Sequence, residues 1–296
     1  MKFKEAYVAR EIRDACAFIA PLILFALAFI LLPVAGTTLT SFFRDVTFLP
    51  RSFSGIGNYQ KLLGDPRFWS SVRFTLLFVV VSVSAEITLG MIFALILNQK
   101  LRVRGILRTA LLIPWAIPIA ISARIWQLLY SYDYGLFNGL LDRTGIVSTP
   151  VNFLGTPGGA FFSVVISDVW KTTPFVTIIL LAGLSAIPRD VYKQAMVDGT
   201  TFYQRFLKIT LPLLKPVLIV ALVFRTIDAL RIFDLVYVLT GGGPGGSTTP
   251  LSLYAYKSFL AGDFGYGSGI SVIIFLMALG LSVLYLKVGR FGFALK

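Results

Sequence analysis

Six long apolar stretches, separated by short charged segments, constrain this chain more than any other feature of its sequence. They cover residues of about 15 to 38, 72 to 97, 107 to 130, 160 to 185, 211 to 239 and 268 to 288. The hydrocarbon core of a bilayer is about 30 Å thick, so each helix that crosses it needs about 20 apolar residues. A helix also satisfies its own backbone polar groups inside lipid. The sequence therefore predicts an all-α polytopic membrane protein with six transmembrane helices.

The overall composition supports a membrane protein and excludes several kinds of chemistry. Apolar residues make up 56% of the chain and charged residues only 14%. The net charge of +13 comes from basic residues beside the apolar stretches, so we expect membrane topology and no nucleic-acid partner. With no histidine and one cysteine, Cys16, we expect neither a metal site nor an internal disulfide. The first apolar stretch is too long for a signal-peptide core and is predicted to be an uncleaved span.

The basic residues also predict the sidedness of the chain. If the N-terminus is cytoplasmic, the inner segments carry about twice as many lysines and arginines as the outer ones, although several outer ones gather between residues 39 and 71. We therefore expect segments 1–14 and 289–296 to be cytoplasmic, and 188–210 with them. Pro114, Pro118 and Pro174 lie inside predicted spans, where they favour kinks more than breaks.

One cytoplasmic segment, "YKQAMVDGTTFYQRFLKITLP" from Tyr192 to Pro212, is amphipathic and interrupted by a glycine. A first apolar stripe lies on the N-terminal side of Gly199 and a second on the C-terminal side. The pattern predicts two short helices along the membrane surface, joined at Gly199, with Pro212 opening the next span. An ordinary basic interfacial loop is the alternative on amphipathicity alone.

The spacing within this segment resembles a known motif. Asp198 and Gly199, then nine residues, then Ile209-Thr210-Leu211-Pro212, resemble the cytoplasmic coupling motif of permease subunits in ABC importers. Lys193-Gln194-Ala195 departs from it, because the family has Glu-Ala-Ala there, so the resemblance carries no acidic ATPase contact over to Lys193. A paired permease subunit would supply that contact.

Further patterns resemble the carbohydrate-uptake branch of the same family. They are "GIGNYQKLLGDPRFW" from Gly55, "LLIPWAIP" from Leu111, "YGLFN" from Tyr134 and "LTGGGPGGSTTPL" from Leu239. "WKTTPF" from Trp170 and "FRTIDALRIFD" from Phe224 are similar to trehalose- and maltose-type permeases.

This resemblance implies a type I ABC importer permease fold in the cytoplasmic (inner) membrane of a prokaryote. It implies a second permease subunit, two ATP-binding subunits and an extracytoplasmic sugar-binding protein, with ATP and Mg used by the ATPase and no cofactor bound by this chain. The sequence agrees, because it contains no G-x-x-x-x-G-K-[ST] phosphate loop. The ATPase-coupling residues that it implies are Lys193, Ala195, Asp198, Gly199, Phe206, Ile209 and Pro212. The loop with Gly241, Gly242, Gly243 and Pro244 is flexible and outward-facing in this interpretation and would contact the binding protein.

Charged residues inside spans are candidates for the translocation path, because an ionisable group in a membrane is costly unless it faces a cavity or a partner. The predicted path residues are Asp168, Thr172, Phe175, Arg225, Asp228 and Arg231. Carboxylates, guanidinium groups and aromatic faces suit an uncharged sugar.

Two structural alternatives compete with the path interpretation. The residues from Arg225 to Asp234 repeat every three positions, so the helix would neutralise its own charges, and successive members rotate by about 60°, so all four would not face one cavity. Arg231 and Asp234 would then be structural or contact the binding protein. Glu86 and Arg124 are lone charges in their spans, for which we expect pairing between helices.

The sequence supports a transport function, for which three hypotheses are considered. The main hypothesis is a permease subunit for a trehalose- or maltose-like disaccharide. The alternatives are an ABC permease for another solute such as glycerol phosphate, and an ion-coupled secondary sugar transporter that uses Glu86, Asp168 or Asp228. No set of nucleophile, base and orienting group points to an enzyme.

Overall fold

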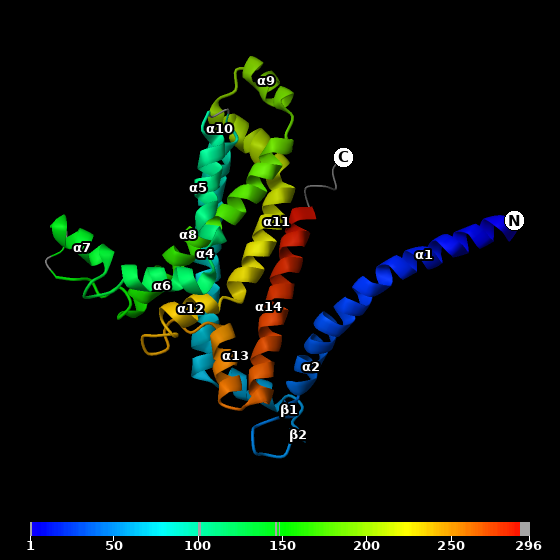
Figure 1. The fold of residues 1–296 in the computed structure, drawn as a ribbon, viewed down its shortest axis with the longest axis vertical. Coiled ribbons are helices and arrows are strands. Elements are labelled where there is room, and N and C mark those ends of the chain that lie inside the picture. Colours follow the sequence, from blue (N-terminus) through cyan, green and yellow to red (C-terminus); the bar gives the residue numbers. More distant parts are fainter. Residues whose placement is uncertain (1, 100–101, 146, 148, 291–296) are drawn as a thin grey trace. The chain divides into compact units, whose positions relative to one another are not determined.

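The computed structural model describes residues 2–99, 102–145, 147 and 149–290 and divides into two compact units (Figure 1). The first unit comprises Met1–Gly64 and Lys257–Val272, and the second comprises Asp65–Tyr256 and Ile273–Lys296. Of the predicted cytoplasmic tail, residues 291–296 lie outside the described residues, as does Lys100 of the first inner loop.

The first unit begins with a long helical segment and continues into a small hairpin. Helix α1 (Lys2–Ala26), a π-helical turn η1 (Leu27–Leu31) and α2 (Leu32–Thr40) follow one another directly. Strands β1 (Phe43–Arg44) and β2 (Ser52–Phe53) then pair antiparallel, before α3 (Gly57–Leu63). The buried Asn58 side chain donates to the carbonyls of Ser41 and Phe43, which joins α3 to the start of the hairpin.

The second unit contains most of the helices. They are α4 (Pro66–Leu97), α5 (Arg104–Ala116), α6 (Ile119–Leu129), α7 (Leu136–Arg143), α8 (Pro157–Ala186), α9 (Arg189–Val197), α10 (Phe202–Arg205), the π-helical turn η2 (Phe206–Thr210), α11 (Leu211–Leu230) and α12 (Asp234–Leu239). Helices α13 (Leu251–Leu260) and α14 (Phe264–Arg290) each continue from one unit into the other.

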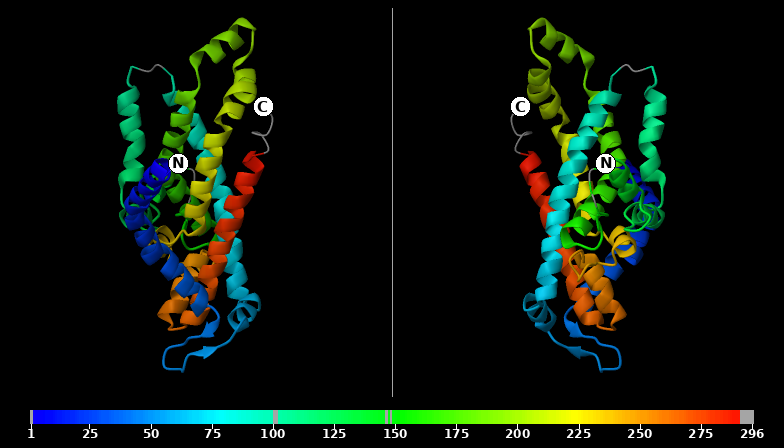
Figure 2. Two further views of the ribbon diagram at one scale, coloured as in Figure 1. Left: turned by 90° about the vertical axis from the view of Figure 1, so that its right-hand side faces the viewer. Right: turned by 90° about the vertical axis from the view of Figure 1, so that its left-hand side faces the viewer.

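Helices α4, α8 and α11 form the centre of the second unit and run side by side (Figure 2). Two glycines allow this close packing. A Cβ on Gly90 of α4 would lie 2.6 Å from Val176 of α8, and a Cβ on Gly183 of α8 would lie 2.6 Å from Leu214 of α11. Both α4 and α8 start at a proline that follows a capping side chain, Asp65 and Thr156 respectively, as expected for helix N-termini.

Within the part of the chain that the structure describes, five helical segments are long and apolar enough to cross a membrane: Arg13–Thr40, Pro66–Leu97, Pro157–Ala186, Phe202–Leu230 and Phe264–Val288. The predicted third span is instead two helices, α5 and α6, bent by 92°. The expected kink at Pro118 is therefore wrong, because the chain breaks there. Ile117 is extended, as the residue before a proline tends to be, and the Pro118 nitrogen has no hydrogen to continue the helix. Pro114 and Pro174 do lie inside helices, as expected.

The predicted fifth span of 211 to 239 is also wrong at its outer end, since α11 stops at Leu230. Arg231 leaves the helical conformation with φ −100° and ψ 19°, and the separate helix α12 follows. In α12, Leu235 and Val236 are buried in the same apolar core as Trp126 of α6. The hydropathy pattern predicted one span because both α11 and α12 are apolar. The chain changes direction between them, however, and this change lets α12 be buried in the core.

Candidate functional site

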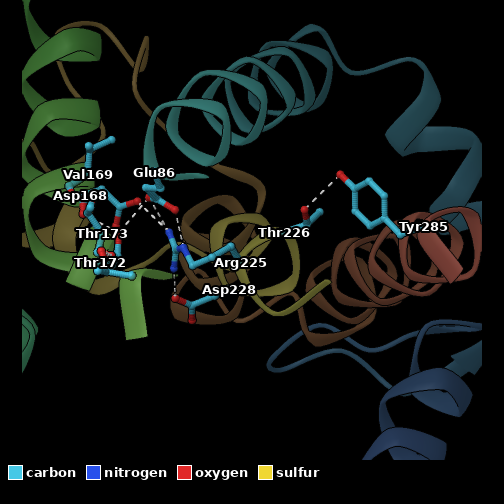
Figure 3. Close-up of polar contacts among 10 residues, drawn as sticks. Glu86, Asp168, Val169, Thr172, Thr173, Arg225, Thr226, Asp228 and Tyr285 are labelled. Atoms are coloured by element: carbon cyan, nitrogen blue, oxygen red, sulfur yellow. Dashed lines mark hydrogen bonds and ion pairs between the residues drawn. The ribbon is translucent and has the colours of Figure 1, made fainter. Parts of the chain in front are cut away.

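A buried ionic cluster joins the three central helices of the second unit (Figure 3). The guanidinium of Arg225 on α11 donates to both carboxylate oxygens of Glu86 on α4, at 2.5 Å and 2.8 Å. The same guanidinium binds Asp168 of α8 at 3.1 Å and Asp228 of its own helix at 2.5 Å. Thr172 of α8 donates to Glu86 at 2.8 Å. One arginine therefore holds carboxylates from three helices.

Burial makes this cluster electrostatically demanding. The side chains of Glu86 and Arg225 are 0% and 3% exposed, whereas that of Asp228 is 51% exposed. Taking charges out of water costs several kcal/mol per ion, which the two-oxygen contact between Arg225 and Glu86 and the further hydrogen bonds offset. Asp228 is thus the member of the cluster that presents a free face to an approaching solute.

Lys171 of α8 stabilises the break between α5 and α6. Its ammonium donates to the carbonyls of Pro114, Trp115 and Ile117, at 3.4, 3.3 and 2.5 Å. These carbonyls lie at the C-terminal end of α5, where a helix has no N–H partners of its own and where its dipole favours a cation. Lys171 is a charged residue within the predicted span 160 to 185, and this helix end supplies its hydrogen-bond acceptors.

Two cavities border the ionic cluster. One, of about 310 Å³, is lined by Ile119, Asp168, Lys171, Thr172, Arg225, Asp228, Ala229, Arg231, Ile232, Phe233, Asp234 and Leu235. The other, of about 410 Å³, is lined by Trp115, Thr172, Phe175, Phe224, Arg225, Ile227, Asp228 and Arg231. Charged groups and aromatic rings therefore line adjacent spaces beside Asp228.

All six predicted path residues line at least one of these cavities. The expectation that Arg225, Asp228, Arg231 and Asp234 would not share a cavity is wrong, because the 310 Å³ space contacts all four. That expectation assumed one continuous helix, along which successive charged residues rotate about the axis. Because the helix ends at Leu230 and the chain turns at Arg231, this rotation does not continue to Asp234. Arg231 donates to Asp228 at 3.3 Å from a side chain that is 70% exposed.

Other parts of the site differ from the sequence expectations or were missed by them. Glu86 does pair between helices, as predicted, and its partner is Arg225. Arg124 instead donates to Gln127 on its own helix. Trp115 and Phe224 were not predicted, although Phe175 stacks on Trp115 and meets Phe224 edge-on. No spacing signal links these aromatic residues, since they come from three different helices.

The segment that resembles a coupling motif forms an elbow, residues 189–210, at one end of the second unit (Figure 1). Gly199 has φ +71°, a left-handed conformation that glycine adopts without strain. The next residue, Thr200, then donates from its backbone and its hydroxyl to the carbonyl of Ala195, at 3.1 and 2.5 Å. The predicted turn at the glycine is thus confirmed, and it closes on the end of α9.

The second half of the elbow is not a separate helix, contrary to the sequence prediction. A continuous helical segment runs from Phe202 to Leu230, and Pro212 lies inside it. Because Pro212 has no N–H to donate to the carbonyl of Lys208, the ladder changes locally, and Leu211 donates five residues back to Phe206. A movement of the elbow would therefore act directly on α11 and its ionic cluster.

The other predicted coupling residues divide between the inside and the outside of the elbow. Ala195 is buried and Phe206 packs against the core of α4, α8 and α11, while Ile209 is half-buried. Lys193 is exposed and binds Asp190 at 2.8 Å, and Asp198 is exposed at the end of α9. The elbow also exposes large apolar side chains, above all those of Met196, Val197, Phe202 and Tyr203.

The glycine-rich loop is more closely hydrogen-bonded than its composition indicated. Its backbone has positive φ at Gly241, Gly242, Gly245 and Gly246. Thr248 donates to the carbonyl of Gly243 at 2.6 Å, and Thr249 donates to that of Gly242 at 3.1 Å. Gly242 is buried, whereas Gly241 is exposed and Gly243 and Pro244 are half-buried. The expected flexible loop is therefore a turn structure closed by its threonines.

Comparison with known proteins identifies relatives over nearly the whole chain. Residues 86–288 match the family described as binding-protein-dependent transport system inner membrane component. The chain is 56% identical over 283 residues to a trehalose/maltose transport system permease protein of Thermococcus litoralis, covering 95% of each chain. It is 36% identical over 281 residues to a trehalose transport system permease protein of Mycobacterium tuberculosis, covering 94% of this chain and 89% of the relative.

A solved structure shares the fold. The chain superposes with a TM-score of 0.83 on a chain of a bacterial ABC transporter involved in the import of the acidic polysaccharide alginate, covering 97% of this chain and 98% of that one. The two are 24% identical in sequence, so the match concerns the fold.

Proposed function

Because this chain belongs to the family of binding-protein-dependent transport system inner membrane components, we propose that it is the permease subunit of an ATP-driven importer for trehalose- or maltose-like disaccharides. The relative that is 56% identical over 95% of both chains is a trehalose/maltose permease protein, which supports this substrate class.

The observation that carries the substrate class is the paired cavity beside Asp228. An uncharged sugar needs donors and acceptors for its hydroxyls and aromatic surface for its apolar ring faces. The partly exposed Asp228 carboxylate and the Arg231 guanidinium supply the first, and the rings of Trp115, Phe175 and Phe224 supply the second. Glu86 and Asp168 hold Arg225 in place behind them.

The proposal includes an ATPase that docks on the elbow. Met196, Val197, Phe202 and Tyr203 are 53%, 88%, 69% and 69% exposed and form an apolar surface of the kind that partners cover. ATP and Mg would be used by two such partner subunits, while this chain binds neither. Closure of the partners would move α9 and, through the continuous helix from Phe202, shift α11 beside the cavity.

The remaining partners follow from the same proposal. A second, unequal permease would complete the path and supply the acidic coupling contact that Lys193 lacks. An extracytoplasmic binding protein would contact the loop around Gly241 and Pro244. The chain would lie in the inner membrane with lipid around its spans and with both termini in the cytoplasm.

The test is uptake by the reconstituted system. Proteoliposomes with this chain, its partner permease, the ATPase and the binding protein should import labelled trehalose or maltose only with ATP. The Asp228→Asn variant should lower uptake strongly, whereas Asp142→Asn makes the same charge change at an exposed position of α7 and should not. Uptake by this chain alone without ATP would contradict the proposal and favour a secondary transporter.

The competing substrate classes are tested in the same system. Glycerol phosphate should fail to compete, because the cavity beside Asp228 balances its cations with carboxylates and offers no excess positive charge to a phosphate. An ion-coupled mechanism needs a carboxylate that is free to exchange its ion, and Glu86, Asp168 and Asp228 are all bound by Arg225.

A further inference from the structure

A third cavity in the second unit lies away from the ionic cluster, and its chemistry differs from that of the other two. It has a volume of about 300 Å³ and is enclosed by the ends of α4 and α8 and the first turns of α5. The lining residues are Leu97, Arg108, Leu111, Leu112, Ile178, Leu181, Ala182 and Ser185. Six of these side chains are aliphatic, so most of the wall offers no hydrogen-bonding group to the hydroxyls of a sugar.

The charged group of this cavity is Arg108 of α5, while the hydroxyl of the other polar lining residue, Ser185 of α8, donates to the carbonyl of Leu181. Arg108 precedes Leu111 and Leu112 by three and four residues, so these side chains share a face of the helix, with the leucines about 5 Å farther along its axis. Arg104 lies one turn before Arg108 on the same face. The face therefore changes from cationic to aliphatic within about two turns.

Among the residues that the structure describes, no carboxylate forms an ion pair with Arg104 or Arg108. No acidic residue occurs between Glu86 and Asp133, and Glu86 is bound to Arg225. Within the described part of the chain, the Nε atom of Arg104 is buried without a hydrogen-bond partner. A buried guanidinium N–H without a partner is costly, which indicates that an anionic group from outside the chain satisfies this end of α5.

From this arrangement we infer that the cavity between α4, α5 and α8 binds an anionic phospholipid. The phosphate contacts Arg108 and Arg104, and an acyl chain lies along Leu111, Leu112, Ile178 and Ala182. Basic pockets between membrane helices suit anionic head groups, and an acyl chain needs an aliphatic wall at bilayer depth. The inference requires only that α5 lies in a membrane and does not depend on which solute is transported.

Lipid retention by the purified full-length chain tests the inference. The chain is placed in nanodiscs of phosphatidylcholine with a minor fraction of phosphatidylglycerol, extracted in mild detergent, and the lipid that remains bound is measured by native mass spectrometry. Arg108→Ala should lower retained phosphatidylglycerol about five-fold or more, as expected for a basic contact near the membrane surface. Arg102→Ala is the matched control, because it removes the same charge from an exposed position that does not line the cavity.

A second variant tests the acyl-chain half of the site. Ala182→Phe fills the cavity from α8 and leaves both arginines in place, so it should also lower phosphatidylglycerol retention. Equal losses for Arg108→Ala and Arg102→Ala would mean diffuse attraction and would overturn the inference, as would unchanged retention in Ala182→Phe. Displacement of the lipid by inorganic phosphate alone or by trehalose would assign the cavity to another ligand and overturn it too.

Discussion

At the scale of single residues, the packing of the three central helices depends on one guanidinium, that of Arg225, which pairs with three carboxylates. The side chains of Arg225 and Glu86 are both buried, so water does not solvate either charge. A buried ion pair adds little to stability compared with an apolar replacement of the same shape, but the loss of one partner leaves the other charge buried and unpaired. The cluster therefore acts mainly to fix how α4, α8 and α11 meet.

Removal of Arg225 should consequently destabilise the protein strongly. Arg225→Met is expected to lower the free energy of unfolding by about 3 to 5 kcal/mol, because the Glu86 carboxylate stays buried without its partner. The measurement is thermal or denaturant unfolding of the purified chain in detergent. Arg231→Met serves as control, with an expected change below about 1 kcal/mol, since its side chain is 70% exposed.

A double variant separates the ion pair from simple packing loss. Adding Glu86→Gln to Arg225→Met removes the unpaired charge and should recover part of the lost stability. If the double variant is as unstable as the sum of its single changes, or if Arg225→Met behaves like Arg231→Met, the account of the cluster is wrong.

The sequence could identify the members of this cluster but not their pairing. Asp168, Arg225 and Asp228 stand out because charges are rare in spans. Glu86 and Arg225 are separated by 139 positions, and hydropathy says nothing about the rotation of one span relative to another. The aromatic lining of the 410 Å³ cavity was harder still to predict, because Trp115 and Phe224 look like ordinary lipid-facing residues in an apolar stretch.

At the scale of helices, the turn of the elbow at Gly199 was predicted because its signals are local, although the helix that follows it continues into α11. A left-handed glycine at a fixed distance from a proline describes backbone geometry within one segment. The failures at Pro118 and Leu230, by contrast, occurred where distant parts of the chain decide the outcome. The break at Pro118 is stabilised by Lys171 from another helix, and α11 ends at Leu230 because α12 packs beside α6. A hydropathy window detects apolar length and not a change of direction.

The elbow depends on the conformation of Gly199. Its φ of +71° suits glycine, whereas a β-branched residue is strongly disfavoured there. Gly199→Val should shift the chain between α9 and α10 and lower sugar uptake per ATP hydrolysed, while the amount of protein in the membrane stays normal. Uptake and ATPase activity are measured together in proteoliposomes of the complete system.

Gly139→Val is the control for this variant. Both glycines have open space where a Cβ would be added, but Gly139 lies in α7 without a positive φ. If the size of the valine side chain were the cause, both variants would lower sugar uptake per ATP hydrolysed to the same extent. If the backbone conformation is the cause, only the change at position 199 lowers it. Wild-type coupling in Gly199→Val would count against the elbow as the transmission element.

At the scale of the whole molecule, function requires that the elbow and the glycine-rich loop face opposite sides of the membrane. The charge distribution predicts a cytoplasmic elbow, although several basic residues of the segment between 39 and 71 weaken the bias. The order of the spans agrees with a cytoplasmic elbow. The bent pair α5 and α6, together with α7, separates α4 from α8, so α4 and α8 would cross in the same direction and the elbow would follow α8 on the cytoplasmic side. Sidedness is therefore the assumption on which both the ATPase contact and the binding-protein contact depend.

The single cysteine makes this assumption directly testable. Cys16 is exposed, so a Cys16→Ser background removes the only native thiol. Into it we place Ser52→Cys, exposed in the hairpin of the first unit, or Val197→Cys, whose native side chain is 88% exposed on the elbow. A membrane-impermeant maleimide applied to intact spheroplasts should label the first variant at once and the second only after permeabilisation, because both sites are accessible and only the side differs. Each variant must retain sugar uptake, so that the labelled form is the working one. Labelling of Val197→Cys from outside would invert the topology, and the elbow would then lie on the side where no ATP is available to drive it.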